Sequence, residues 1–248
     1  MHLLRRGPVL TDPLEPYAVV DRVRPDGRCW LMAHMVGGLD GSAAIGGRVA
    51  ELSTAPDAQL FRLMRTLADV VLVGAETVRR EGYGPVQLPP DRMAARRAAG
   101  RAATPPVAVV TRSLDLDWSA RVFAEAPAGS RTLVITCQET DPARLAEAGQ
   151  VADVLLAGRG RVDPGLAMTM LTGRGYRVAL CEGGPTWLGE LVAAGLLDEL
   201  CLTVSPMMGG DPLPVSVSPP GAPLVPFALR QVLGDGDTLF LRYERGSA

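Results

Sequence analysis

The chain has 248 residues, of which 47% are hydrophobic and 21% are charged, so it can bury a full core as one large domain or two small ones. Its formal net charge of −2 excludes the basic field that attracts nucleic acids or anionic membranes. No apolar run has the length of a membrane-spanning helix, and the N-terminus lacks the apolar segment of a signal peptide. We expect a cytoplasmic protein without nucleic-acid or membrane partners.

Cysteine and histidine usage argues against a metal site. The sequence has only two histidines, His2 and His34, and its four cysteines are far apart, with no C-x-x-C pair among them. Three of the cysteines lie in apolar runs, which is typical of buried free thiols in a reducing compartment. We therefore predict no bound metal.

The first part of the chain has little periodicity. Residues 1–28 are rich in Pro, Arg and Asp, and we predict an N-terminal extension that lies over the domain or is partly mobile. An apolar strand is expected over 30–36, followed by a glycine turn over 37–41 and a small-residue loop over 42–52. A helix opens near Asp57, with Ser53 or Thr54 as its cap.

Strands and helices alternate through the middle of the chain. Strands are predicted over 70–73, 107–110, 132–136, 154–156, 178–181 and 198–205, and helices over 75–81, 142–149, 164–172 and 185–194, with a short helical piece possible within 91–101. Two last strands over 227–233 and 238–243 read as a hairpin. This order predicts one α/β domain over 29–248, with a mainly parallel sheet flanked by helices and a C-terminal antiparallel hairpin.

The stretch Glu182-Gly-Gly-Pro-Thr186 lies between a predicted strand and a predicted helix. Pro185 suits the first helical position, and Gly183 and Gly184 would let a phosphate approach the backbone without a Cβ in the way. Because free N–H groups and the helix dipole favour an anion there, we predict a dinucleotide pyrophosphate site. An ordinary tight turn between strand and helix is the alternative.

Two further strand ends look specialised for a nucleotide, Gly74–Thr77 and Thr111–Ser113. Ligands of open α/β sheets lie outside the carboxyl ends of the strands, although neither a G-x-G-x-x-G fingerprint nor a P-loop is present. Arg112 between two hydroxyl residues suits a 2′-phosphate and favours NADP over NAD. A solvated turn residue is the alternative for Arg112.

Nothing in the sequence indicates covalent catalysis, since there is no nucleophile elbow and few histidines are available. This fits hydride transfer, in which the cofactor carries the reaction. Asp40, Asp57, Arg65 and Glu182 are candidate polar groups near the reacting end. Three of them also have local explanations: Asp40 could form a turn, Asp57 could sit at a helix N-terminus, and Arg65 could pair with Asp69.

Three motifs in order carry a family resemblance: Val36–Gly41, Leu67–Val78, and Glu182–Thr186 followed by Gly195–Leu200. Together they resemble the reductase domain that forms the C-terminal half of the riboflavin-biosynthesis deaminase-reductase, from about Trp30 to the C-terminus. The resemblance implies a dihydrofolate reductase-like fold, NADPH as cofactor and hydride transfer to C1′ of a ring-opened ribosylaminopyrimidine 5′-phosphate. It also implies a homodimer, for which Leu200–Val204 and the C-terminal hairpin are candidate contacts.

The resemblance and the strand ends together give a set of site residues. The predicted cofactor contacts are Gly37, Gly74, Thr77, Val78, Glu81, Thr111, Arg112, Ser113, Gly183, Gly184, Pro185 and Thr186. The predicted substrate contacts are Asp40, Arg65 and Glu182, and the predicted catalytic residues are Asp57 and Glu182.

The sequence also departs from the family. Gly38 stands where the family usually has Ser, residues 46–52 lack its polar-Trp pattern, no arginine follows Gly84-Pro85 closely, and the zinc deaminase half with its H-x-E and P-C-x-x-C motifs is absent. Three hypotheses remain open: an NADPH-dependent pyrimidine reductase, a dihydrofolate or other pteridine reductase with Asp57 as the pteridine-binding carboxylate, and a non-catalytic NADP-binding module.

Overall fold

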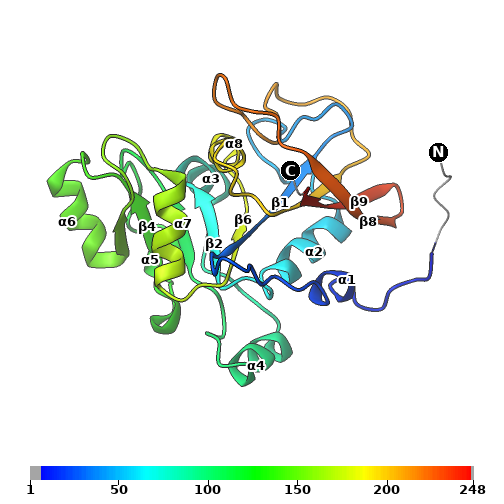
Figure 1. Cartoon of the computed structure of the whole chain (residues 1–248), viewed down its shortest axis with the longest axis horizontal. Helices are drawn as coiled ribbons and strands as arrows, with labels where there is room; N and C mark the ends of the chain where they lie inside the picture. Colours follow the sequence, from blue (N-terminus) through cyan, green and yellow to red (C-terminus); the bar gives the residue numbers. More distant parts are fainter. Residues whose placement is uncertain (1–6, 247–248) are drawn as a thin grey trace.

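The computed structural model describes residues 7–246, so His2 and the first six residues of the predicted extension lie outside the described residues. Nine strands within this range form one sheet: β1 (Trp30–Gly37), β2 (Val70–Gly74), β3 (Val107–Val110), β4 (Leu133–Thr136), β5 (Asp153–Leu156), β6 (Val178–Cys181), β7 (Glu199–Val204), β8 (Phe227–Asp235) and β9 (Thr238–Arg245). Their order in the sheet is β5-β4-β3-β2-β6-β1-β7-β9-β8. Figure 1 shows the sheet crossing the molecule from the α6 side to the β8–β9 hairpin.

Strand direction follows the prediction. β1 to β7 are parallel to one another, and β9 runs antiparallel to β7 and β8. The five residues of β2 are all buried, because a parallel strand is covered on both faces. The predicted α/β class with a C-terminal antiparallel hairpin is confirmed.

The register leaves an opening at the carboxyl end of the sheet. β6 ends at Cys181, which pairs with Ala33 of β1, whereas β1 continues to Gly37 beside β7. The chain after Cys181 therefore turns away while β1 runs on. Polar groups of the later part of β1 and of the turn after β6 can meet at this point.

Helices cover both faces of the sheet. α7 (Pro164–Gly173) and α8 (Pro185–Ala193) pack on one face through apolar residues such as Met168 and Leu191. α3 (Ala75–Glu81), α5 (Arg121–Ala124) and α6 (Pro142–Val151) cover the other face over β2 to β5, and α1 (Glu15–Ala18) and α2 (Ala55–Met64) cover it over β6 to β9. α4 (Pro90–Ala98) and the short 3₁₀ helix η1 (Ala128–Ser130) lie in connections before β3 and β4.

The described part of the N-terminal segment packs against the domain. Leu14 and Tyr17 are 1% exposed and belong to the core cluster that includes Phe240. Arg22 donates two hydrogen bonds to the buried Glu199 carboxylate, from Nε and Nη2, each 2.8 Å long. The Trp30 indole N–H donates a third bond, 3.1 Å long, to Glu199. This segment thus completes the cover over β7.

Two local features differ from a simple reading of the sequence. Thr54 is the N-cap residue of α2, as one of the two candidates, but its side chain makes no capping bond; the Ser53 hydroxyl donates a 2.6 Å hydrogen bond to Asp57 in the first turn. The four-residue helices α1 and α5 fall in segments for which no helix was predicted. Helices of one turn are too short to show a periodic pattern and depend on tertiary packing.

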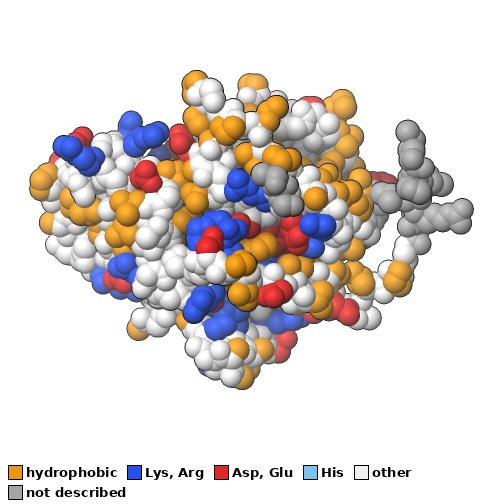
Figure 2. Space-filling view, in the orientation of Figure 1, with side chains coloured by type: hydrophobic (Ala, Val, Ile, Leu, Met, Phe, Trp, Pro, Cys, Tyr) orange, Lys and Arg blue, Asp and Glu red, His pale blue; other side chains and the backbone are white. Residues whose placement is uncertain are grey.

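The exterior is mixed in charge. Figure 2 shows arginine and acidic side chains interspersed with apolar ones on the face seen in Figure 1. No helix within residues 7–246 has the length and apolar character needed to cross a membrane.

The Arg22–Glu199 pair gives a stability prediction. Arg22→Ala leaves a fully buried carboxylate with weaker partners, so we expect a loss of about 3–5 kcal/mol in the free energy of unfolding, measured by urea titration. Arg230→Ala is the matched control, because it breaks the exposed Arg230–Glu244 pair and is expected to cost less than about 1 kcal/mol. Equal losses for the two variants would contradict a structural role for the buried pair.

Candidate active site

The three strand ends singled out in the sequence lie side by side. β3, β2 and β6 are consecutive in the sheet, with Gly74 paired with Val110 and Leu72 paired with Cys181. Since the strands are parallel, Gly74–Thr77, Thr111–Ser113 and Glu182–Thr186 all follow carboxyl ends at one edge of the fold. The structure therefore brings together most of the predicted cofactor contacts.

The turn between β6 and α8 is tied to the start of α3. The Gly74 N–H donates to the Gly183 carbonyl over 3.1 Å, and the Gly184 N–H donates to the Thr77 hydroxyl over 3.1 Å. A Cβ on Gly74 would lie 3.4 Å from the Cα of Gly184. Gly183 and Gly184 have φ of 121° and 62°, which only glycine adopts readily.

These contacts shape a helix N-terminus that faces outward. α8 begins at Pro185, and the N–H groups of Thr186 and Trp187 stand in its first turn, where no intrahelical acceptor exists. The start of α3 lies beside it through Thr77. Two helix N-termini and a side-chain-free glycine surface together form a place for an anion.

Other predicted cofactor residues are placed less directly. Gly37 ends β1, two strands from Gly74, where a Cβ would lie 3.0 Å from Val215. Val78 lies on the buried face of α3 and belongs to the hydrophobic core. Glu81 ends α3 and accepts a 3.0 Å hydrogen bond from the Val49 N–H, so its carboxylate holds the loop after β1.

The turn after β3 is polar and exposed. The Thr111 hydroxyl accepts a hydrogen bond from the Leu114 N–H over 3.1 Å, and Ser113 accepts one from Asp115 over 3.3 Å. Leu114 has a φ of 53°, rare for a residue with a side chain. The guanidinium of Arg112 is exposed and has no hydrogen-bonding or ionic partner within residues 7–246.

Glu182 and Arg65 bind each other. Arg65 donates two hydrogen bonds of 2.7 Å to the Glu182 carboxylate, whose side chain is fully buried. Tyr83 donates its hydroxyl to the same carboxylate and accepts a 3.1 Å bond from Arg65. The Arg65 guanidinium also lies 4.5 Å from the ring centroid of Phe61. The local Asp69 partner considered for Arg65 is therefore wrong; Asp69 binds Arg101 instead.

The Glu182 carboxylate accepts hydrogen bonds from two side chains, Arg65 and Tyr83. Burial, and then the Glu182 carboxylate, raise the pKa of Tyr83 well above 10, so its hydroxyl remains a donor at neutral pH. With Arg65 and Tyr83 both directed at it, Glu182 acts as an acceptor that orients these two groups.

A second buried polar pair adjoins the first. Asp57 of α2 and His34 of β1 are 2% and 4% exposed, with Asp57 Oδ1 lying 3.6 Å from His34 Nε2. Asp57 Oδ1 and His34 Nδ1 have no hydrogen-bond partner among the described residues. Burial lowers the pKa of His34. The Asp57 and Glu182 carboxylates raise this pKa, but their effect is smaller than that of burial. A neutral imidazole therefore faces Asp57.

Asp40 has a structural role in the turn after β1. Its carboxylate accepts hydrogen bonds from the N–H and hydroxyl of Ser42 and from the Gly209 N–H, at 3.1, 2.6 and 2.8 Å. The Ser42 hydroxyl, foremost among these donors, lowers the pKa of Asp40 to about 2. A Cβ on Gly38 would lie 2.9 Å from the Met207 carbonyl, which accounts for glycine at this position.

His34 and Tyr83 were not among the predicted site residues. A histidine in an otherwise apolar strand was the available signal for His34, because a buried imidazole needs a polar neighbour. Tyr83 gave no local signal, since its partners lie 18 and 99 positions away in the sequence.

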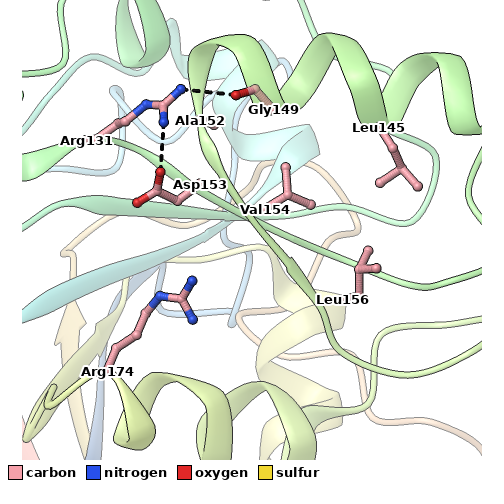
Figure 3. A pocket seen from close by; sticks show the side chains of 8 residues that line it. All are labelled: Arg131, Leu145, Gly149, Ala152, Asp153, Val154, Leu156 and Arg174. Atoms are coloured by element: carbon pink, nitrogen blue, oxygen red, sulfur yellow. Dashed lines mark hydrogen bonds and ion pairs between the residues drawn. The ribbon is translucent and has the colours of Figure 1, made fainter.

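Two hollows lie away from these residues. One of about 460 Å³ lies against edge strand β5, where Arg131 is tied to Asp153 and to the Gly149 carbonyl (Figure 3). Another of about 380 Å³ lies at the amino ends of the strands, lined by residues that include Arg96 and Arg101. Their guanidiniums bind the carbonyls of residues 66–68 and 102. Arg96 and Arg101 therefore have a structural role.

Comparisons with known proteins agree with this arrangement. The family model of the RibD C-terminal domain matches residues 29–237, and the chain belongs to this family of reductases. The 2,5-diamino-6-ribosylamino-4(3H)-pyrimidinone 5′-phosphate reductase of Methanothermobacter thermautotrophicus is 30% identical over 174 residues, which are 69% of this chain and 75% of that protein. The chain is thus identified as a reductase, as the sequence predicted.

Solved structures show the same fold. A pyrimidine reductase-like protein of Corynebacterium diphtheriae superimposes with a TM-score of 0.81 and 27% identity, covering 89% of this chain and 93% of that one. The riboflavin biosynthesis reductase of Saccharomyces cerevisiae superimposes with a TM-score of 0.65 and 15% identity, covering 94% and 97%. The architecture of the whole domain is therefore shared with these proteins.

The lowered pKa of His34 gives a pH prediction. The unfolded chain takes up a proton at His34 near pH 6.5 while the folded chain does not, so stability is highest above pH 6.5 and falls as the pH falls below it. We expect the free energy of unfolding to decrease as the pH falls from 7.5 to 5.5, measured by urea titration. His34→Gln should remove this slope; an unchanged slope would contradict a neutral His34.

Proposed function

We propose that the protein is an NADPH-dependent reductase that acts on a riboflavin-pathway ribosylaminopyrimidine 5′-phosphate, adding hydride to C1′ of the ring-opened ribose. The observation that carries the proposal is the convergence of three specialised strand ends beside a buried polar cluster. The 30% identity to a reductase named for such a substrate supports the choice of substrate.

The glycine surface suits the pyrophosphate of NADPH. The close approach of Gly74 and Gly184 leaves no Cβ over the first turn of α8, so phosphate oxygens can reach its N–H groups. Arg112 and Ser113 after β3 would then receive the 2′-phosphate. Bound NADPH supplies the hydride, and this chain supplies the position and the electrostatics of the site.

The pair Arg65–Glu182 lies where the reacting ends would meet. Glu182 of this pair follows β6 directly, and the pair lies next to His34 on β1. We propose that Arg65 and Tyr83, held by Glu182, present N–H and hydroxyl donors to the substrate. The Arg65 side chain is 13% exposed, whereas the Glu182 side chain is fully buried. Arg65 is therefore the member of the pair that a substrate can reach.

A pteridine such as dihydrofolate is a second candidate substrate, and one observation favours it. Asp57 Oδ1 and His34 Nδ1 are buried polar atoms without a partner among residues 7–246, and such atoms cost about 1–3 kcal/mol each. An aminopyrimidine ring carries adjacent N–H groups that would pair with the Asp57 carboxylate. Asp57 would then bind the ring and assist its protonation.

We further propose a cytoplasmic homodimer. Four buried, free cysteines fit a reducing compartment. The outer strand β8 of the C-terminal hairpin pairs only with β9 within the described chain, so its other edge can meet a second copy.

A substrate assay tests the function. Purified protein with NADPH is given the pyrimidine phosphate and, separately, dihydrofolate, and oxidation is followed by nicotinamide absorbance. We expect turnover of the pyrimidine phosphate. Oxidation with dihydrofolate alone would select the second candidate, and tight NADPH binding without either oxidation would leave a binding module.

Asp57→Asn separates the two substrates. The amide keeps the shape of Asp57 but cannot take up a proton, so if dihydrofolate is the substrate its turnover should fall by at least about 100-fold, as is usual for loss of a general acid or base. Affinity for NADPH, measured by fluorescence titration, should stay within about twofold. Unchanged dihydrofolate turnover would exclude Asp57 from pteridine chemistry.

Arg112→Ala tests the cofactor. Loss of a charged phosphate partner worth about 1.5–3 kcal/mol should weaken NADPH binding by roughly 10- to 150-fold and leave NADH binding nearly unchanged. Equal loss for the two nicotinamide cofactors would overturn the assignment of Arg112.

A further inference from the structure

A second arginine lies against the turn after β3. Arg144 of α6 donates from Nη1 to the Ser113 carbonyl over 3.2 Å and lies 3.9 Å from the Asp115 carboxylate. Its side chain is 45% exposed. Because the carbonyl uses one of five N–H donors, Arg144 retains donors for an anion above the turn.

The position of Arg144 is set by the start of α6. The Thr140 hydroxyl lies 3.3 Å from the Arg112 carbonyl and bonds to the Cys137 carbonyl over 2.8 Å, which fixes the approach to α6 against the turn. The Asp141 side chain caps the helix at the Ala143 N–H. Arg112 and Arg144 therefore belong to rigidly connected segments on either side of Ser113.

The acidic groups nearby do not neutralise the positive charges of Arg112 and Arg144. Arg79 of α3 donates to the Asp115 carbonyl and shares the Glu76 carboxylate with Arg80. Asp115 is the acid facing Arg144, and its side chain is 75% exposed, so the 3.9 Å pair is weak. Arg144 thus faces a single solvated carboxylate, and Arg112 has no ionic partner among the described residues.

We propose that Arg144 is a second determinant of NADP specificity, which binds the 2′-phosphate from the α6 side while Arg112 binds it from the turn. The inference rests on the proposed function. A phosphomonoester dianion has three acceptor oxygens and suits two guanidinium groups. The 2′-hydroxyl of NADH carries no charge, and so it gains little from Arg144.

Two adenosine ligands test the proposal. Adenosine 2′,5′-bisphosphate and 5′-AMP differ only in the 2′-phosphate, and calorimetry gives their affinities for the full chain. Arg144→Gln should weaken the bisphosphate by about tenfold and leave 5′-AMP within twofold. Arg174→Gln is the matched control, because it removes an exposed arginine at the opposite end of the sheet and should change neither affinity.

Removal of the Asp115 carboxylate should have the opposite effect and strengthen binding of the bisphosphate. Asp115→Asn frees Arg144 and removes a repelling charge, so the bisphosphate should bind about two- to fivefold more tightly at low salt. This gain should shrink in the double variant with Arg144→Gln, where only the removal of the repelling charge still acts. A simple structural role for Arg144 predicts no such reduction.

The outcomes distinguish a failure of the proposed NADP use from a failure of the proposed role of Arg144. If the wild-type chain binds the two ligands equally, the proposed use of NADP fails. If the wild-type chain prefers the bisphosphate, and Arg144→Gln keeps that preference while Arg112→Ala loses it, only the role of Arg144 is overturned. Circular dichroism of each variant checks that it is folded.

Discussion

The backbone contact between Gly74 and Gly183–Gly184 is the constraint on which the site depends. It joins the end of β2 to the turn after β6 through the hydrogen bond from the Gly74 N–H to the Gly183 carbonyl, and a Cβ on Gly74 or Gly184 would lie 3.4 Å from the Cα of the other. Because the strands are parallel neighbours, this single contact places two helix N-termini together. A side chain at Gly184 would also be strained, because its φ of 62° lies in the left-handed region that favours glycine.

Beside this open glycine surface, the domain buries charge in matched pairs. Glu182 is held by Arg65 and Tyr83, and Glu199 by Arg22 and Trp30. The first pair orients donors at the carboxyl edge of the sheet, whereas the second attaches the N-terminal segment to β7. Their common physical basis is that a buried carboxylate needs several donors to offset its lost hydration.

The sequence predicted the sheet, its direction and the three strand ends because these depend on local patterns. Apolar runs, glycine breaks and Pro185 all act within a few residues. It did not predict α1 or α5, whose single turns depend on packing. It also suggested a local partner, Asp69, for Arg65, although the actual partner, Glu182, lies 117 positions away. Asp40, predicted to bind substrate, accepts a hydrogen bond from the Gly209 N–H, 169 positions away, which no local pattern could show.

The sequence by itself determined the class of fold and the position of the glycine turn at Glu182–Thr186, since strand, turn and helix signals are local. Only the tertiary structure decided which groups meet in the interior. It placed His34 next to Asp57 and directed Tyr83 at Glu182, through contacts between β1, α2 and the turns after α3 and β6. Such pairings depend on strand order, and strand order arises from the packing of the whole chain.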